Sequence, residues 1–222
     1  MKKIKEILKK VRLMINKCGS KCRYKNLKIK NPTIISNNCW GGIVSQYLGI
    51  KYYTPTVGLY FFSNEYIKFL KKFRYYVNQK IEIIDTSKSK YYEELKKKGH
   101  EKSLVGKLDD VEIVFLHYKS ASEIREKWKK RVKRINWDYI IFKFNDQNLC
   151  EEKFINDFDE LPYKNKICFS TKNFPNLKSV IWFRNQKNKM EVEKDYYVSH
   201  RYINMIDFIN KMEKERWWFV ND

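Results

Sequence analysis

Residues 33–48 constrain the fold of this chain more than any other stretch. The β-branched run Thr33–Ile35 is followed by the polar Ser36–Asn38, then by Cys39–Gly42 and a fresh apolar pattern that ends at Leu48. This order predicts a strand, a sharp turn and a helix. It places the polar residues at the carboxyl end of a strand, where α/β proteins build their sites. The two adjacent glycines allow a tight turn and the close approach of a ligand.

The rest of the chain alternates between strand and helix patterns. Strands are expected at Val111–Leu116, Tyr139–Phe144, Lys166–Ser170 and Ser179–Phe183, and helices near 120–135, 151–158 and 200–213. Such alternation predicts an α/β fold, a three-layer α/β/α arrangement with a largely parallel sheet. We expect an N-terminal basic helix and loop at residues 1–32 and a single α/β domain at residues 33–222.

Residues 1–17 predict an amphipathic helix, because Ile4, Ile7, Leu8 and Val11 fall at helical spacing between lysines. It either packs on the domain, which we favour, or lies on an anionic membrane. The first ten residues are too charged for a secretory signal, and no run of about 18 apolar residues exists to span a bilayer. We therefore expect a cytoplasmic protein, with peripheral contact at the inner face of the membrane as the alternative.

The five cysteines are odd in number and irregularly spaced, which favours reduced thiols. Cys18 and Cys22 lack the second close pair that a zinc site needs, so no metal is expected. The formal charge is +21, yet 38 of the 47 basic residues are lysines, asparagine occurs 19 times and alanine once. This bias is typical of an AT-rich genome. A nucleic-acid partner is therefore not expected, whereas nucleotide phosphates, acidic glycans or a membrane surface fit the charge.

Cys39 is the first candidate for chemistry. A thiol near a helix N-terminus has its pKa lowered by the helix dipole, and the free N–H groups there stabilise an oxyanion. The alternative is a small buried hydrophobic residue. The sequence around Cys39 favours neither.

His117 and Asp146 each follow a predicted strand. In a parallel sheet the carboxyl ends of strands converge, so His117 would approach Cys39 as its base, and Asp146 would orient His117 or a substrate hydroxyl. The alternatives are a partly exposed histidine with a structural hydrogen bond and an ordinary turn at Asn145-Asp146.

Lys127, Arg131 and Arg134 have the spacing of one helical face, and arginine suits bidentate recognition of phosphate or carboxylate. A solvated face is the alternative.

The chain resembles a family of bacterial polysaccharide-locus proteins known as the domain of unknown function DUF1919, often labelled exopolysaccharide biosynthesis protein. The matching segments are Ile34–Gly42, Tyr53–Phe61, His117-Tyr118, Lys127-Trp128, Arg131, Arg134–Asn136 and, more weakly, Lys166–Phe169. The resemblance implies an α/β/α fold and a role in making capsule or other surface glycans. The Asn38-Cys39 turn is also similar to the Gly-Asn-Cys turn of capsule acetyltransferases that bind coenzyme A, which would place Cys39 at an acyl or coenzyme A site.

Three functions follow as hypotheses. The favoured one is an acyltransferase acting on a glycan precursor, with a coenzyme A thioester as donor and no other cofactor. The alternatives are a glycosyl- or phosphotransferase with a nucleotide-activated donor, for which Asp157-Phe158-Asp159 is the one Asp-x-Asp match, and a non-catalytic protein that binds an anionic ligand. The expected catalytic residues are Cys39, His117 and Asp146. The expected binding residues are Ser36, Asn37, Asn38, Trp40, Gly41, Gly42, Lys127, Trp128, Arg131 and Arg134.

Overall fold

The computed structural model describes residues 19–215 and 217, so the helix expected over residues 1–17 lies outside the described residues. The described part begins with helical residues 19–25. Leu27, just after them, is buried in one cluster with Ile34 and Leu48, and the Lys28 amide donates to Asn210 Oδ1 at 2.7 Å. Residues 27 and 28 therefore pack on the domain.

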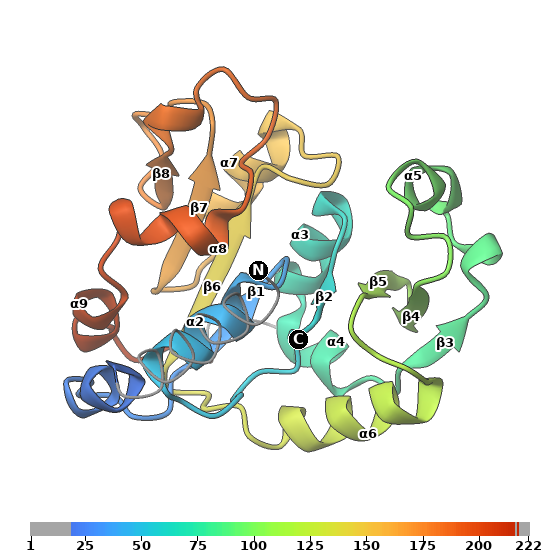
Figure 1. The fold of residues 1–222 in the computed structure, drawn as a ribbon, viewed down its shortest axis with the longest axis horizontal. Coiled ribbons are helices and arrows are strands. Elements are labelled where there is room, and N and C mark those ends of the chain that lie inside the picture. Colours follow the sequence, from blue (N-terminus) through green and yellow to red (C-terminus); the bar gives the residue numbers. More distant parts are fainter. Residues whose placement is uncertain (1–18, 216, 218–222) are drawn as a thin grey trace, which may run out of the picture.

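A parallel sheet forms one half of the molecule (Figure 1). Its strands, in the order β1-β6-β7-β8, are Thr33–Ser36, Ile140–Asn145, Lys166–Ser170 and Val180–Trp182. All three pairings are parallel, and Ile34 lies opposite Ile141 in the first. The predicted α/β class is confirmed.

Helices cover both faces of this sheet. Ile34 and Ile141 face α2 (Trp40–Leu48) and α9 (Met205–Asn210). Their neighbours Ile35 and Phe142 face the other way, toward α3 (Ser63–Lys71) and α7 (Glu152–Glu160). This alternation follows from the two-residue period of a strand. It creates the three layers visible in Figure 1.

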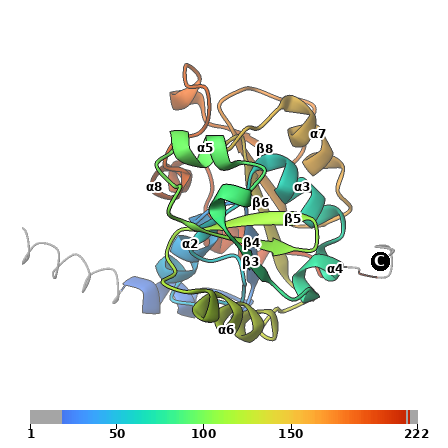
Figure 2. The same ribbon diagram turned by 90° about the vertical axis from the view of Figure 1, so that its right-hand side faces the viewer.

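A second, antiparallel sheet forms the other half of the molecule (Figure 2). Its strands, in the order β2-β5-β4-β3, are Leu59–Tyr60, Val111–Phe115, Leu104–Leu108 and Glu82–Ile84. The placement of Val111–Phe115 in a largely parallel sheet was therefore wrong. The reason is the two-residue turn Asp109-Asp110, in which Asp109 has a φ of 55°. A connection this short joins only antiparallel strands.

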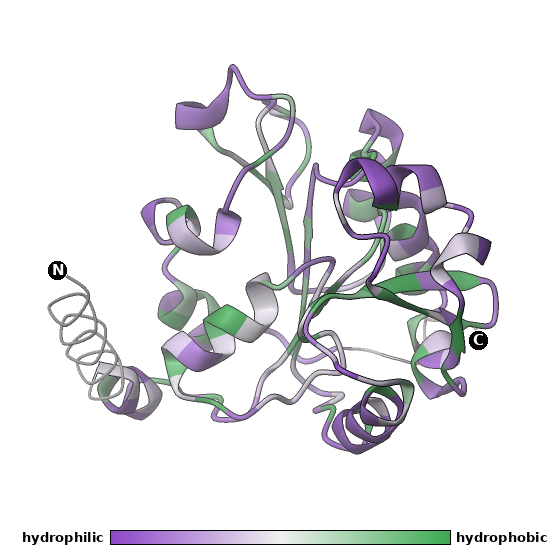
Figure 3. Ribbon diagram, turned by 45° about the vertical axis from the view of Figure 1, so that its right-hand side comes forward, coloured by the Kyte–Doolittle hydropathy of each residue, from purple (hydrophilic) through white to green (hydrophobic). Residues whose placement is uncertain are grey.

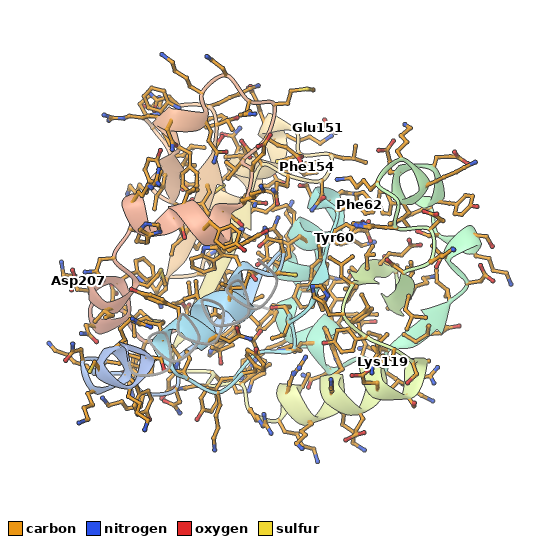
Figure 4. All side chains as sticks on the ribbon, in the orientation of Figure 1. Tyr60, Phe62, Lys119, Glu151, Phe154 and Asp207 are labelled. Atoms are coloured by element: carbon orange, nitrogen blue, oxygen red, sulfur yellow. The ribbon has the colours of Figure 1, made fainter. Side chains whose placement is uncertain are left out.

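Helix α3 lies between the two sheets. The Tyr66 hydroxyl donates to the Ile35 carbonyl on β1 at 3.0 Å, and the buried Glu65 accepts from the Glu112 amide on β5 at 2.7 Å. Tyr60 and Phe62, labelled in Figure 4, belong to a smaller apolar cluster with Leu95 of α5 (Tyr92–Lys97). The two halves thus share packed elements.

The remaining helices depart from expectation in their lengths. The helix expected near 200–213 is two pieces, the 3₁₀ turn Ser199–Arg201 and the short α9. A separate helix, α8 (Asp195–Val198), precedes them. Helix α3 is separated from α4 (Phe73–Asn78) by Lys72, whose φ is −131°. Two more 3₁₀ turns span Thr86–Lys88 and Arg184–Gln186.

Helix α6 (Ala121–Val132) has Ser120 as its N-cap, and the Ser120 side chain accepts a hydrogen bond from the Glu123 amide. Figure 3 shows this helix as largely hydrophilic. Among residues 19–215, no helix combines the length and the apolar character needed to cross a membrane.

Candidate functional site

The turn between β1 and α2 is held by its own side chains. Ser36 Oγ donates to the Asn38 carbonyl at 2.6 Å and accepts from the Gly41 amide at 3.1 Å. A Cβ atom at Gly41 would lie 2.8 Å from Ser36 Oγ and 3.1 Å from Ile34 Cγ2. Gly41 is therefore required by packing inside the turn.

A buried polar network lies directly behind this turn. Lys143 on β6 and Asp195 at the start of α8 form an ion pair whose side chains are 0 % and 1 % exposed. Lys143 Nζ also donates to Asn37 Oδ1 at 3.2 Å and to Asn38 Oδ1 at 3.1 Å. Asp195 Oδ2 accepts from Asn145 Nδ2 at 2.8 Å. We call these five residues the strand-end network.

The strand-end network is bonded internally and to Gln147, whose Oε1 accepts from Asn38 Nδ2 and Asn145 Nδ2, both at 3.0 Å. Asn37 Nδ2 donates to Asn145 Oδ1 at 2.7 Å, and Asn38 Nδ2 donates to Asp195 Oδ2 at 3.0 Å. Among the described residues, no buried side-chain nitrogen or oxygen lacks a hydrogen-bond partner. Burial lowers the pKa of Lys143, and the Asp195 carboxylate opposes that shift. A buried ion pair needs such complete satisfaction, because desolvating both charges is expensive.

Asn37 and Asn38 were expected as ligand contacts, but their amides are committed to the interior. Trp40 is likewise fully buried, and its Nε1 donates to Ser199 Oγ at 3.0 Å. Gly42 serves packing: a Cβ atom there would lie 3.2 Å from Val57 Cγ1. These residues of the motif form a rigid frame.

Cys39 is the part of the motif that reaches the surface. Among residues 36–42 every other residue is buried, and Cys39 is half-buried. Its Sγ lies 3.9 Å from the Leu59 carbonyl oxygen. Burial, with a further contribution from the Asp195 carboxylate, raises the pKa of the Cys39 thiol, although Lys143 and the Leu59 hydrogen bond oppose this. The expected lowering of this pKa by the helix is therefore wrong.

The amides at the start of α2 also differ from expectation. The Trp40 amide donates to Asn38 Oδ1 at 3.1 Å, and the Gly41 amide donates to Ser36 Oγ. These two N–H groups are occupied, so neither is free to stabilise an oxyanion.

His117 approaches Cys39 from the antiparallel sheet. It follows β5, is exposed, and its amide donates to the Gly58 carbonyl at 3.2 Å. A Cβ atom at Gly58 would lie 3.3 Å from His117 Cβ. Cys39 and His117 thus contact adjacent residues, Leu59 and Gly58, although no hydrogen bond joins them in the described chain.

Asp146 follows β6 at the carboxyl edge of the parallel sheet, as expected, directly after Asn145 of the strand-end network. Its carboxylate accepts from the Thr171 amide and from the Val192 amide, both at 2.7 Å, and from Ser170 Oγ at 3.1 Å. It therefore ties the end of β7 to the segment before α8. The structure does not bring it to His117, because β5 belongs to the other sheet.

The cationic side chains expected on one face of α6 have different partners and different exposures. Lys127 pairs with Glu123 at 2.5 Å. Arg131 Nη1 donates to the Tyr118 hydroxyl at 2.6 Å, and that hydroxyl donates to the Val57 carbonyl at 2.5 Å. Arg131 is thereby connected to the segment that holds Gly58 and Leu59.

Two other expected binding residues, Arg134 and Trp128, lie differently. Arg134 lies beyond the end of α6 and is exposed, because the chain turns there to bury Ile135. Trp128 is a core residue, 4 % exposed, with Nε1 donating to the Val77 carbonyl at 3.3 Å.

An apolar groove opens one helical turn from Cys39. It encloses about 600 Å³ between Ile43 and Tyr47 of α2 and the segment from Tyr196 to Ile206. Tyr196, which follows the buried Asp195 of the strand-end network, lines this groove.

The acidic candidates for metal binding have structural partners. Asp157 pairs with Lys71 at 2.7 Å, and Asp159 Oδ1 accepts from the Ser179 amide at 2.7 Å. Within the described ranges, no group of three or more His, Cys, Asp or Glu side chains is placed to hold a metal ion.

Sequence reasoning missed Lys143 and Asp195. Lys143 carried a signal, since a lysine inside the apolar run Tyr139–Phe144 must be paired when buried. Asp195 carried none, because its partner is 52 residues away in the chain.

Together these features define an α/β protein with a buried polar network behind the half-buried Cys39. The family model described as a domain of unknown function (DUF1919) matches residues 9–217, and the chain belongs to this family. A Haemophilus influenzae protein, described as an uncharacterized protein, is 32% identical over 168 residues, covering 76% of this chain and 75% of the relative.

Proposed function

We propose that this chain is an acyltransferase of surface-glycan synthesis and that the acyl group is transferred at Cys39. One observation carries the proposal: the motif buries all its other residues in a fixed frame and leaves the Cys39 thiol accessible at the start of α2. Fixed placement of a reacting group is what proximity catalysis requires. The resemblance of the Asn38-Cys39 turn to that of coenzyme A-binding acetyltransferases supports the same assignment.

The proposed chemistry begins from a protonated thiol, because the pKa of Cys39 is raised. A base must therefore remove the Sγ proton as the sulfur attacks the donor's thioester carbonyl. His117, whose amide bonds the carbonyl of Gly58 next to Leu59, takes this role and passes the proton to the departing donor thiolate. In the second step His117 takes a proton from an acceptor hydroxyl, which attacks the Cys39 thioester and releases the free thiol.

The surroundings supply binding elements for such a donor. Arg131 has guanidinium N–H groups beyond the one that bonds Tyr118, and with the exposed Arg134 it offers positive charge to donor phosphates. The groove beside Ile43 accepts an apolar arm of about the size that small-ligand sites hold. The proposed donor is a coenzyme A thioester, the acceptor is a glycan precursor, and the proposed setting is the cytoplasm or the inner face of the membrane.

Intact-protein mass spectrometry after incubation with acetyl-coenzyme A tests this function. We expect one acetyl group per chain, mapped to the peptide that contains Cys39 and removed by hydroxylamine. Cys39→Ala should abolish the adduct. Cys22→Ala, which removes an exposed thiol outside the motif, should not change it. No adduct on the native protein, together with no binding of coenzyme A, would contradict the proposal.

A further inference from the structure

A hollow lies beside α6, and the proposed acyl transfer does not use it. It has a volume of about 510 Å³ and lies between α6 and the segment from Val77 to Ile81. Its floor is rigid and apolar: Val77, Ile81 and Trp128 are 1 %, 3 % and 4 % exposed. The Trp128 hydrogen bond to Val77 ties the two walls together. We call this feature the α6 hollow.

Cations line the rim of the α6 hollow. Arg125, Lys129 and Lys133 follow at four-residue intervals along α6 and its C-cap, and Lys80 lies on the opposite wall. Along a helix this interval places successive side chains roughly 6 Å apart on one face. All four side chains are exposed. None of them forms an ion pair with another residue of the part of the chain that the structure describes.

A carboxylate lies at one end of the cationic rim. An adjoining hollow of about 530 Å³ shares Lys80 and Arg125 but adds the carboxylate of Glu82. A further hollow of about 550 Å³ shares Asn78 and Gln79 with the α6 hollow and is also lined by Arg74. The Glu82 carboxylate bounds the rim cations on its side, which disfavours a long polyanion that would run past it.

We propose that the α6 hollow binds a small phosphorylated organic molecule that carries at least two negative charges. Arg125 contacts a phosphate in bidentate fashion, and Lys129 and Lys80 supply point charges from the two walls. The apolar body of the ligand lies over Trp128 and Val132. The volume falls within the range of small-molecule sites. Arg125 matters most to the proposal, because lysine is common throughout this chain and arginine occurs only 9 times.

Isothermal titration calorimetry on the full-length protein tests the proposal with three probes: inorganic pyrophosphate, ADP and UDP. We expect pyrophosphate to bind, and at least one nucleotide to bind more tightly because the floor contacts its body. The double variant Arg125→Gln/Lys129→Gln should weaken binding of each by about tenfold or more, since both lost contacts are charge-assisted. Lys130→Gln removes one charge from the same helix outside the hollow, and it should leave the affinities unchanged.

The site is independent of the proposed acyl transfer, so Cys39→Ala should bind all three probes as the native protein does. Thermal unfolding of each variant establishes that it is folded. The proposal is overturned if none of the probes binds at millimolar concentration, or if Lys130→Gln weakens binding as much as the double variant. It is also overturned if affinity rises with chain length for heparin or single-stranded DNA while the nucleotides bind no better than chloride. Such a result would show a general polyanion surface.

Discussion

The strand-end network and the α6 hollow use positive charge in opposite ways. In the network, Lys143 is fully buried, and its ammonium group contacts three oxygen-bearing side chains. In the hollow, Arg125 and Lys129 are exposed, and neither pairs with an acidic residue of the described chain. The Lys143 charge is neutralised inside the protein and stabilises the fold, whereas the cations of the hollow remain available to a ligand.

The same contrast exists within the opening motif. Asn37 and Asn38 have the residue types of a binding site, yet their hydrogen bonds fix β1 to β6 and α8. Cys39, directly after them, reaches the surface. Residue type alone therefore does not distinguish the frame of a site from its reacting groups. Burial and partners make the distinction.

The largest expected effect comes from breaking the buried ion pair. Asp195→Ala leaves the Lys143 ammonium buried without its counter-charge, which should reduce the free energy of unfolding by about 3–5 kcal/mol. Urea denaturation followed by circular dichroism measures this change. Lys143→Met/Asp195→Leu, which removes both charges, should recover much of the loss.

A matched surface pair provides the control. Lys172 and Glu152 lie 2.7 Å apart with both side chains more than half exposed, so Glu152→Gln should leave the unfolding midpoint nearly unchanged. If Asp195→Ala lowers stability as little as Glu152→Gln does, the strand-end network is accessible to water. The contrast between its buried charges and the exposed charges of the α6 hollow would then not hold.

Gly41→Ala should produce the next largest effect. In an open helix this change stabilises a protein by about 1 kcal/mol. Here the new Cβ atom meets Ser36 Oγ at 2.8 Å, and overpacking of this kind costs about 1–3 kcal/mol. Gly42→Ala meets only the movable side chain of Val57 and should be milder. The order of the two unfolding midpoints checks the assignment, and a stabilising Gly41→Ala would contradict it.

The order of elements in the parallel half could be predicted because each strand has its own local signal. The run Thr33–Ile35, the Ser36–Asn38 turn and the following helix were recognised together, and the structure places them as expected. The lengths of α8 and α9 could not be predicted, because the backbone divides where Asp195 and Ser199 form long-range contacts.

The candidate site was predictable only in part, for a topological reason. Strands β1 and β6 pair in parallel, so the meeting of Ser36, Asn37 and Lys143 at one edge follows from sheet geometry. His117 was expected at the same edge, but β5 belongs to the antiparallel sheet. His117 is connected to the segment that Cys39 contacts through β2, which pairs with β5. This strand has only two residues, too few to show the alternating hydrophobic pattern of a strand in the sequence.

The pH dependence of Cys39 modification should show how far the frame influences the exposed thiol. Only the thiolate reacts with iodoacetamide. Because the pKa of Cys39 lies above its ordinary value of 9.0, alkylation should rise with pH through a midpoint above 9.0. Peptide mapping separates Cys39 from Cys150, whose pKa burial raises to about 12 and which should react at higher pH than Cys39. A Cys39 midpoint below the ordinary value would show that the helix, and not burial, controls this thiol.

Tyr118→Phe should have a small effect on stability and should test whether Arg131 serves the structure or a ligand. The Tyr118 hydroxyl joins Arg131 to the Val57 carbonyl, and its loss should reduce the free energy of unfolding by about 1 kcal/mol. Tyr75→Phe, which removes an exposed phenol bonded to Asp109, should cost less. Because the hydroxyl positions Arg131 beside the Gly58-Leu59 segment, Tyr118→Phe should slow acetylation of Cys39 although the protein stays folded. Equal acetylation rates in the two variants would show that Arg131 has a structural role only. The cations of α6 that are available to a ligand would then be those of the α6 hollow.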